Sequence, residues 1–467
     1  MMYKDFADYA LSILKKEKVD YGEVRLEETE GEGLVLKNGI PEVSGFENSA
    51  GVGIRFLVNN SLGFASINKF EKKKISQIVL QAIKRVKRAR NMNANVRLSE
   101  ESVNKKNYKV TQKINLKDID PDKKMKLLHD IDEKIKKAAG RYLSLSYNLN
   151  KKYIITTEGT KIISEIPRNH FTYFLTVQSN GKSAQKFWQY CNAGGFEVVN
   201  QWKLPELMLK EYKAMDLNLR KAEKSPKGKI DLVVGPEVTG IMVHESVGHP
   251  FEADRILGRE AAQAGESFVH KGMIGEKIGS EQVTVADDPT LDKSAGYYLY
   301  DDEGVKARRR YLIKNGVINE FLHNRETAFD MNLRSNGAAR SESFDKEAIV
   351  RMANTFLVPG KFSESELIKD IKFGVYMRDF TEWNIDDKRF QMKYVGSDCY
   401  LIKNGKISNP VLKPIIEITT PALWSNVDAV GKNIEYHTGT CGKGEPMQGV
   451  PAWLGGPSMR IRNVRLG

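Results

Sequence analysis

Residues 230–250, IDLVVGPEVTGIMVHESVGHP, hold the pattern that decides how this chain folds around its chemistry. The first five, Ile230 to Val234, are typical of a short buried strand, and Gly235-Pro236 then starts a helix with proline in its first turn. Such a helix would carry His244 and, five residues later, His249. At about 100° per residue the two would point about 140° apart, so a regular helix cannot aim both at one ion.

The residues beside the second histidine offer a solution. Gly248 precedes His249 and Pro250 follows it. A residue before proline avoids helical dihedral angles, and glycine tolerates the distortion next to it. We therefore expect His244 and Glu245 on the helix, and His249 at the point where that helix kinks or ends.

His244, Glu245 and His249 carry the chemistry of a zinc peptidase. Neutral imidazoles are good zinc ligands, and an adjacent carboxylate can take a proton from a metal-activated water. The common zinc peptidase motif places its histidines at i and i+4, whereas the spacing here is i and i+5. The competing interpretation is a pair of histidines satisfied within the protein core. Spacing alone does not choose between the two.

The longer pattern resembles the TldD/PmbA family of zinc metallopeptidases. The signature around the histidines is His244-Glu245-x-x-Gly248-His249-x-x-Glu252-x-Asp254, and the similarity covers nearly the whole chain. Its C-terminal motifs are specific and its N-terminal motifs are weak. The other matching stretches are Tyr21–Arg25, Gly51–Arg55, Asp301–Gly304, Leu312–Val317, Arg325–Ala328, Asn336–Arg340, Arg351–Thr355 with Pro359-Gly360, and Gly439–Lys443.

A catalytic zinc ion normally has three protein ligands and one water, so the two histidines need a partner. Cys441 lies in a glycine-rich loop, where backbone can approach an ion, and both its thiolate chemistry and the resemblance favour it. The competing interpretation is a buried free cysteine. His437 and Glu252 are the rival ligands, although we expect Glu252 and Asp254 to hold imidazole N–H groups instead. The run 444–449 that follows is longer than in the family pattern.

The resemblance implies a peptidase in which Glu245 is the general base. Zinc would lower the pKa of its bound water to near 7, and Glu245 would accept that proton and deliver it to the leaving amine. His437, His323 and Arg340 are the candidates for stabilising the oxyanion, and none is preferred. The implied substrates are extended or unfolded peptides. A zinc hydrolase of a non-peptide amide is the alternative enzyme.

Length and composition fit two globular domains. The chain has 467 residues, of which 40% are hydrophobic, enough for sizeable cores. No apolar run is long enough to span a bilayer, and residues 1–20 show helical spacing in place of a signal-peptide core. The three cysteines form no disulfide-like framework, which favours a reducing cytoplasm. We expect Cys191 and Cys399 to be core or surface thiols.

The net charge of +13 raises a second hypothesis, a non-enzymatic basic regulator or nucleic-acid-associated protein. The densest basic segment, Lys69–Arg90, has nine basic residues and one acidic residue. It lacks aromatic interleaving, so a surface helix with a solvated basic face is the preferred interpretation. Glu245 also argues against a purely structural zinc site. The apolar stripe of that helix comprises Ile75, Val79, Ala82, Val86 and Ala89.

The whole pattern predicts the α+β class, with an N-terminal α/β domain over residues 1–225 and a strand-rich C-terminal metallopeptidase domain over residues 226–467. The polar segment 224–229 marks the boundary. After the metal helix we expect mostly strands and loops. The expected N-terminal elements are a helix within 1–20, strands at 23–28, 33–36 and 52–58, the basic helix, a helix from Asp120-Pro121 to before Gly140, a β-meander over 141–200, and a helix over 205–221.

The resemblance also implies dimers, either a homodimer or a heterodimer with a related subunit that lacks the metal motif. This chain keeps His244, Glu245, His249 and Cys441, so it corresponds to the metal-binding partner. The N-terminal domain carries none of these residues, and we expect it to shape the substrate path or the dimer contact.

Overall fold

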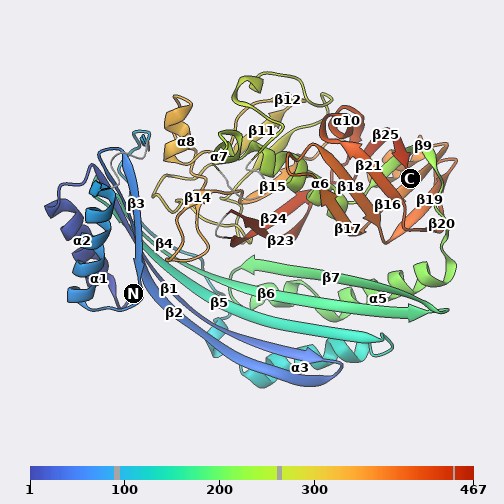
Figure 1. The fold of residues 1–467 in the computed structure, drawn as a ribbon. Helices are drawn as coiled ribbons and strands as arrows, with labels where there is room; N and C mark the ends of the chain where they lie inside the picture. Colours follow the sequence, from blue (N-terminus) through green and yellow to red (C-terminus); the bar gives the residue numbers. More distant parts are fainter. Residues whose placement is uncertain (89–94, 260–265, 445–446) are drawn as a thin grey trace.

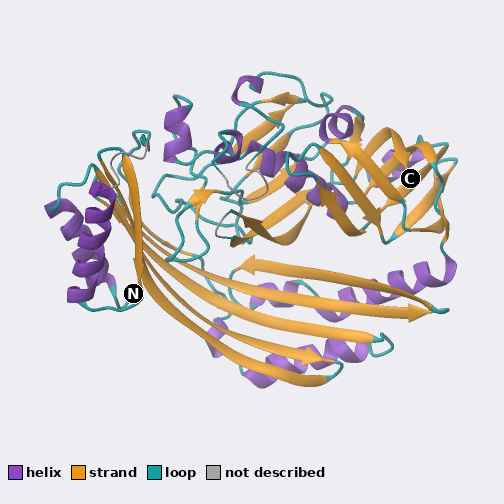
Figure 2. Ribbon diagram, viewed as in Figure 1, coloured by secondary structure: helices purple, strands orange, loops and turns teal. Residues whose placement is uncertain are grey.

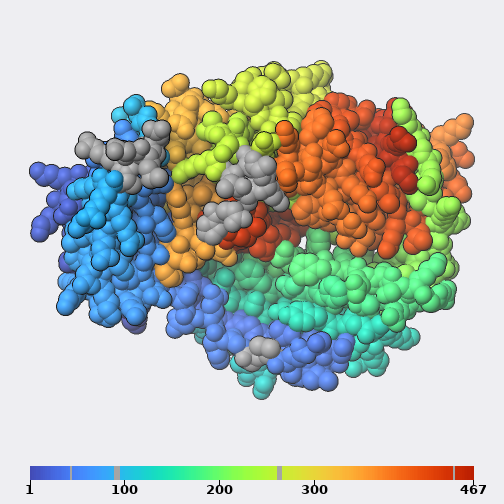
Figure 3. All heavy atoms as spheres, viewed as in Figure 1, coloured from blue at the N-terminus to red at the C-terminus, as the bar shows by residue number. Residues whose placement is uncertain are grey.

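The computed structural model describes residues 1–88, 95–259, 266–444 and 447–467, and the side chains at 43 and 44 are also left out. The expected α+β class is confirmed, because helices and strands mix throughout the chain (Figure 2). A long curved sheet forms one half, and a strand-rich half with the metal motif lies on its concave side (Figure 1). Figure 3 shows the two halves in contact along a long seam. Ala89, Arg90, Glu445 and Pro446, which entered the predictions above, lie outside the described residues.

The curved sheet is almost entirely antiparallel among the described residues, and only β4 runs parallel to its neighbour β6. Its strands follow the order β3-β2-β1-β5-β6, with β4 and β7 both paired to β6. The strands are β1 (Tyr21–Lys37), β2 (Ile40–Val58), β3 (Ser61–Ile67), β4 (Lys105–Lys109), β5 (Gly140–Thr156), β6 (Lys161–Ser179) and β7 (Lys182–Ala193).

These strands are longer than the sequence pattern predicts. The expected strands at 23–28 and 33–36 are parts of β1, and the expected meander is confirmed as β5, β6 and β7, which end at Ala193. Polar residues such as Asn148 and Asn150 interrupt the apolar alternation because they line a polar cavity on the concave side. The alternation therefore marks only the part of each strand that faces an apolar core.

Helices cover the convex face and one end of the curved sheet (Figure 1). Leu128 and Met208 from two of these helices belong to the same buried apolar cluster as Tyr173 of β6. The expected start of a helix at Asp120-Pro121 is confirmed, since the Asp120 carboxylate accepts the N–H of Asp122. The helices are α1 (Lys4–Lys16), α2 (Lys72–Arg88), α3 (Pro121–Lys134), α4 (Glu197–Gln201) and α5 (Leu204–Lys221).

The second half contains mostly strands and loops after the metal helix, as predicted. Its larger sheet comprises β8 (Glu223–Lys224), β9 (Gly228–Val234), β16 (Phe373–Met377), β17 (Phe380–Ile385), β18 (Gln391–Gly396), β19 (Cys399–Lys403), β20 (Lys406–Leu412), β21 (Ile415–Thr419), β22 (Val427–Val430) and β25 (Met459–Leu466). A second sheet comprises β10 (Val285–Asp287), β11 (Arg310–Lys314), β12 (Val317–Ile318), β15 (Asn354–Leu357), β23 (Glu435–Lys443) and β24 (Gln448–Gly456). The remaining elements include the pair β13 (Ala339–Arg340) and β14 (Ile349–Val350) and the helices α6 (Pro236–Val243), α7 (Ala253–Ile256), α8 (Arg325–Asp330), α9 (Glu364–Lys369) and α10 (Thr420–Ser425).

The boundary expected between residues 225 and 226 lies in the loop between β8 and β9, and it stays a proposal. The short β8 pairs with β20 of the second half, so the chain is already attached to that half before the loop. None of the described helices combines the length and the apolar character that crossing a membrane requires.

Candidate metal centre

A π-helical turn explains the five-residue spacing of the histidines. Regular α-helix ends at Val243, and His244–Gly248 form a π turn in which the His249 N–H donates to the His244 carbonyl. An i to i+5 hydrogen bond brings residues five apart onto one side of the helix. The regular helix ends earlier than expected, before His244, so His244 and Glu245 lie in the π turn that continues it. His249 begins a 3₁₀ turn, so the helical path does change at this residue, as expected.

Gly248 and Ser246 fit the turn into its surroundings. A Cβ atom at Gly248 would lie 1.9 Å from the Met352 sulfur, so a side chain there would displace Met352. The Ser246 hydroxyl donates to the Met242 carbonyl at 2.6 Å and accepts the Trp424 indole N–H at 3.0 Å. Both contacts fix the turn against a buried aromatic ring.

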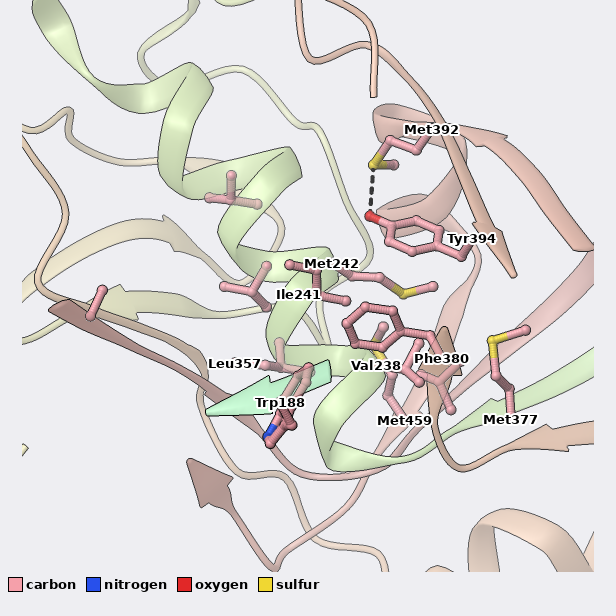
Figure 4. Packing of buried hydrophobic residues seen from close by; sticks show 14 of the residues in the cluster. Trp188, Val238, Ile241, Met242, Leu357, Met377, Phe380, Met392, Tyr394 and Met459 are labelled. Carbon is pink, nitrogen blue, oxygen red and sulfur yellow. Dashed lines mark hydrogen bonds between the residues drawn. The ribbon is translucent and has the colours of Figure 1, made fainter. Parts of the chain in front are cut away.

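The helix that leads into the turn is held by apolar packing. Val238, Ile241 and Met242 of α6 are buried in one cluster with residues from several strands. Figure 4 shows them beside Trp188 of β7 and Phe380 of β17. Each buried side chain of this size contributes about 1.5–3 kcal/mol, so the position of His244 is set by a rigid core.

The structure brings His244, His249 and Cys441 together. Their potential ligand atoms all lie within 4.8 Å of one another, and the three residues are buried. The Cys441 sulfur lies 3.5 Å from His249 Nε2, and the two imidazole rings are nearly perpendicular at 5.0 Å between centroids. Glu245, which follows His244 directly, is buried in the same place.

Cys441 reaches the centre from the hairpin formed by β23 and β24. It pairs with Val450 across the hairpin, and the Arg351 guanidinium donates to its carbonyl oxygen. Burial alone would raise the pKa of the thiol, but the adjacent His249 and Arg351 lower it to about 6. A thiolate at neutral pH is the form that binds a metal ion.

A buried carboxylate positions the second imidazole. The Nδ1 atom of His249 lies 3.1 Å from a Glu252 carboxylate oxygen. If Nδ1–H donates to this carboxylate, Nε2 keeps a lone pair on the side of Cys441. Burial lowers the pKa of both His244 and His249, which favours neutral rings. The expectation that Glu252 holds an imidazole N–H agrees with this geometry.

Asp254 does not take the same role. Its carboxylate accepts from Lys443 Nζ at 2.6 Å, and no imidazole contact is recorded for it among the described residues. Lys443 also lies 3.1 Å from Glu252, and the side chain of this lysine is fully buried. The lysine therefore neutralises both carboxylates and draws Asp254 away from the rings.

Arg389 is a site residue that the sequence analysis missed. Its guanidinium donates to the Glu245 carboxylate at 2.7 Å, from a position 144 residues away in the chain. The backbone of Arg389 is left-handed, with φ of +64°, and its carbonyl accepts the Thr420 hydroxyl at 2.8 Å. Burial raises the pKa of Glu245, while His244 and Arg389 oppose that rise. The segment DDKR at 386–389 carries no motif that would have marked it.

The other candidates lie outside this cluster. His437 is on β23 but packs edge-on against Trp188, with 6.0 Å between ring centroids. His323 Nδ1 lies 3.2 Å from the Thr327 hydroxyl. Arg340 donates to the carbonyl oxygens of Met352 and Pro451. None of the three belongs to the group of potential metal ligands among the described residues.

The residues of the cluster fit a zinc ion. Tetrahedral zinc with Zn–S near 2.3 Å and Zn–N near 2.0–2.1 Å places sulfur and nitrogen about 3.6 Å apart, close to the distance between Cys441 and His249. The Nδ1 atom of His244 is buried and has no hydrogen-bond partner among the described residues. Two imidazoles and one thiolate leave a fourth position for water, as in catalytic zinc sites.

Comparisons with known proteins agree with the sequence resemblance. The profile of the PmbA/TldA metallopeptidase C-terminal domain matches residues 227–467, and that of domain 1 matches residues 22–86. A metalloprotease of Methanocaldococcus jannaschii is 34% identical over 96% of this chain and 98% of its own length. A zinc metalloprotease TldD homolog of Saccharolobus solfataricus is 28% identical over 54% of each chain. The crystal structure of TldE from Thermococcus kodakarensis has the same fold, with a TM-score of 0.76, 19% identity and 99% of both chains covered. The chain belongs to the TldD/PmbA family of metallopeptidases.

Proposed function

We propose that this chain is a zinc peptidase that hydrolyses extended or unfolded peptides. The observation that carries the proposal is the buried cluster of His244, His249 and Cys441 with Glu245 beside it. A structural zinc site needs no adjacent general base and usually has four protein ligands. The printed name of the Saccharolobus relative, a zinc metalloprotease, also supports zinc as the metal.

The protein residues have separate roles in the proposed reaction. His244, His249 and Cys441 would hold the ion, which when bound acidifies water and polarises a carbonyl group. Glu245 would accept a proton at its carboxylate and return it to the leaving amine. Arg389 would keep Glu245 oriented, and its charge favours an ionised carboxylate despite the burial.

The proposal extends to a partner and a location. We propose a dimer, either of this chain with itself or with a related subunit without the metal motif, because the sequence resemblance implies it. The curved N-terminal sheet would then contribute to the substrate path or the dimer contact. The reducing cytoplasm stays a prediction from the three cysteines, all of which are free in the structure. A zinc hydrolase of another amide differs only in the substrate, and the proposed test separates the two.

The test pairs metal analysis with hydrolysis of a pool of unfolded peptides. We expect about one zinc per chain in the wild type and cleavage of the pool. Cys441→Ala should lose the zinc, whereas Glu245→Ala should keep it and lose cleavage by about 10²–10⁴-fold. Cys399→Ala, at a buried free cysteine elsewhere, is the matched control and should change neither.

Two results would reject the proposal. Protein that neither contains zinc nor takes it up has no metal centre of this kind. The second is stoichiometric zinc without cleavage, both by this chain alone and after a metal-free relative is added. That result would indicate a non-peptide substrate.

A further inference from the structure

A polar cavity of about 510 Å³ lies between the curved sheet and the second half of the chain. Side chains of β1, β5 and β6 form its floor, and loops around residues 297–302 and 340–346 form its roof. In Figure 1, β14 and β24 lie on the concave side of the curved sheet. None of His244, Glu245, His249 and Cys441 is among its lining residues.

The cavity and the metal centre lie on opposite faces of one hairpin. Cys441 of β23 is paired with Val450 of β24, so the two side chains share a face. Gly449 and Pro451, on either side of Val450, face the other way and line the cavity. Opposite partners in an antiparallel pair lie about 5 Å apart, so the two sites are close but separated by backbone.

Two arginines at one end of the cavity have no acidic partner. Arg168 donates to the carbonyl oxygens of Ala295 at 2.8 Å and Tyr297 at 3.1 Å. Arg340 is 7% exposed and donates only to carbonyl oxygens, at 2.6 and 2.9 Å. Neither forms an ion pair with any carboxylate that the structure describes. Burial, together with the charges of Arg168 and Arg351, lowers the pKa of Arg340 to about 10.

The carboxylates next to these arginines are already engaged. Lys152 Nζ lies 2.9 and 3.0 Å from the two oxygens of Asp302, and Ser341 donates to the same carboxylate. Asp301 accepts backbone N–H groups of Glu303, Val305 and Ala339. The charge left over at this end is therefore positive, which suits an anionic group of a ligand.

The far end of the cavity has the opposite charge. Glu27 of β1 is 5% exposed, and one of its oxygens accepts from Asn150 at 2.6 Å. The other oxygen, Oε2, is buried without a hydrogen-bond partner among the described residues. An unpaired buried carboxylate oxygen costs free energy unless a cation or donor reaches it. Glu47, which is exposed, adds a second negative charge to the lining.

The distance between the two ends sets the length of a ligand. Glu27 is opposite Lys152, Lys152 is opposite Ser164, and Arg168 is four residues further along β6. With strands about 4.8 Å apart and about 3.3 Å per residue, the two Cα atoms are roughly 16 Å apart. Side chains from both ends shorten this gap, and the charge of Glu27 still acts on Arg168, so the space between the two charged groups suits a ligand no longer than a dipeptide.

We infer that this cavity binds a free dipeptide, with its carboxylate at Arg168 and Arg340 and its ammonium group at Glu27. The inference rests on the proposed function for the source of the ligand, because a peptidase releases such peptides. Phosphates and other polyanions are disfavoured, since Glu27 would repel them. The site holds peptides apart from the centre that would cleave them.

The test measures binding of dialanine, dialanine amide and N-acetyl-dialanine to the full-length Glu245→Gln protein by calorimetry. Dialanine should bind at least tenfold more tightly than either blocked form. In addition, Arg168→Gln should remove the penalty of C-terminal amidation but keep that of N-acetylation. Glu27→Gln should do the reverse, and it retains the oxygen that accepts from Asn150.

Arg220→Gln, at an exposed arginine on α5, is the control and should leave all affinities unchanged. Equal binding of the three peptides, or penalties that persist in both cavity variants, would overturn the inference. The two proposals can fail separately. If the wild type cleaves no peptide but the binding pattern is as described, the proposed peptidase function is wrong and the binding site remains. Circular dichroism of each variant confirms that a weaker affinity does not reflect unfolding.

Discussion

The two faces of the β23–β24 hairpin border buried polar groups of the same kinds, but they balance charge differently. On the metal side, Lys443 contacts both Glu252 and Asp254, and Arg389 contacts Glu245. On the cavity side, Arg168 and Arg340 donate hydrogen bonds to carbonyl oxygens alone, and Glu27 keeps an unpaired oxygen, as far as the described residues show. Charges that are paired within the protein fix the geometry of the site, whereas unpaired charges are available to bind a charged ligand.

The largest effect is expected when the lysine that pairs with two carboxylates on the metal side is removed. Lys443→Met leaves two buried carboxylates without a counter-ion, and we expect the free energy of unfolding to fall by about 3–5 kcal/mol. Urea denaturation followed by circular dichroism measures the change. Lys126→Met, at a lysine whose side chain is 73% exposed, should change stability by less than about 0.5 kcal/mol. A similar loss in both variants would contradict the role of Lys443.

The second prediction concerns the orientation of the His249 imidazole, which the Glu252 carboxylate fixes. Glu252→Gln removes the charge that orients this imidazole, and we expect zinc affinity to fall about 10–100-fold. Competition with a zinc chelator of known affinity gives the value. Glu133→Gln, which alters an exposed pair with Lys136 at the end of α3, should leave zinc affinity unchanged. Unaltered affinity in Glu252→Gln would mean that packing alone orients the ring.

On the cavity side, acid should weaken the pair of Asp302 and Lys152. Burial opposes ionisation, but Lys152 and neighbouring groups lower the pKa of Asp302 to about 2 from its ordinary value of 3.8. A lowered folded pKa means that the stabilisation is complete above about pH 4 and is lost as pH falls toward 2. It amounts to about 2 kcal/mol. The difference in unfolding free energy between wild type and Asp302→Asn, measured from pH 5 to 2.5, should therefore shrink with acid. A constant difference would contradict this assignment.

The smallest effects come from two threonines that attach the hairpin to the curved sheet. Thr438 is buried and receives the Cys191 N–H at 2.8 Å, whereas Thr440 is exposed and donates to Gln189 at 3.0 Å. We expect Thr438→Ala to cost about 1–2 kcal/mol, since it leaves a buried donor unpaired, and Thr440→Ala to cost less than about 0.5 kcal/mol. Thermal denaturation of both variants tests the ranking, and the reverse order would contradict it.

Local features of the fold were predictable because their causes are local. The strand at 230–234 and the helix from Pro236 appear within two residues of their expected starts, as β9 and α6. Asp120 caps α3 through an N–H two residues away. The turn at Asn38-Gly39 also has a local cause, since Asn-Gly favours the positive φ that both residues adopt there.

The contacts that complete the site join distant parts of the chain, so local pattern could not supply them. Cys441 meets His249 across 192 residues, and Arg389 meets Glu245 across 144. Cys441 and His437 lie four residues apart on one strand and therefore share a face. Only the register of β23 against the metal helix decides which one joins the cluster. The resemblance to a family favoured Cys441, but nothing comparable pointed to Arg389 or to the charge balance around Lys443.

The π turn at His244–Gly248 has a consequence for how the motif tolerates changes in length. Relative to a continuous α-helix it contains one additional residue, and each residue of a helix advances the chain by about 100°. Deleting Val247 would restore the commoner i, i+4 spacing and could keep both imidazoles on one side. It would also rotate everything downstream, including Glu252, relative to Cys441 and Lys443. Insertions and deletions in this motif are therefore coupled to β23, the strand that ends at Lys443. The two segments must change length together.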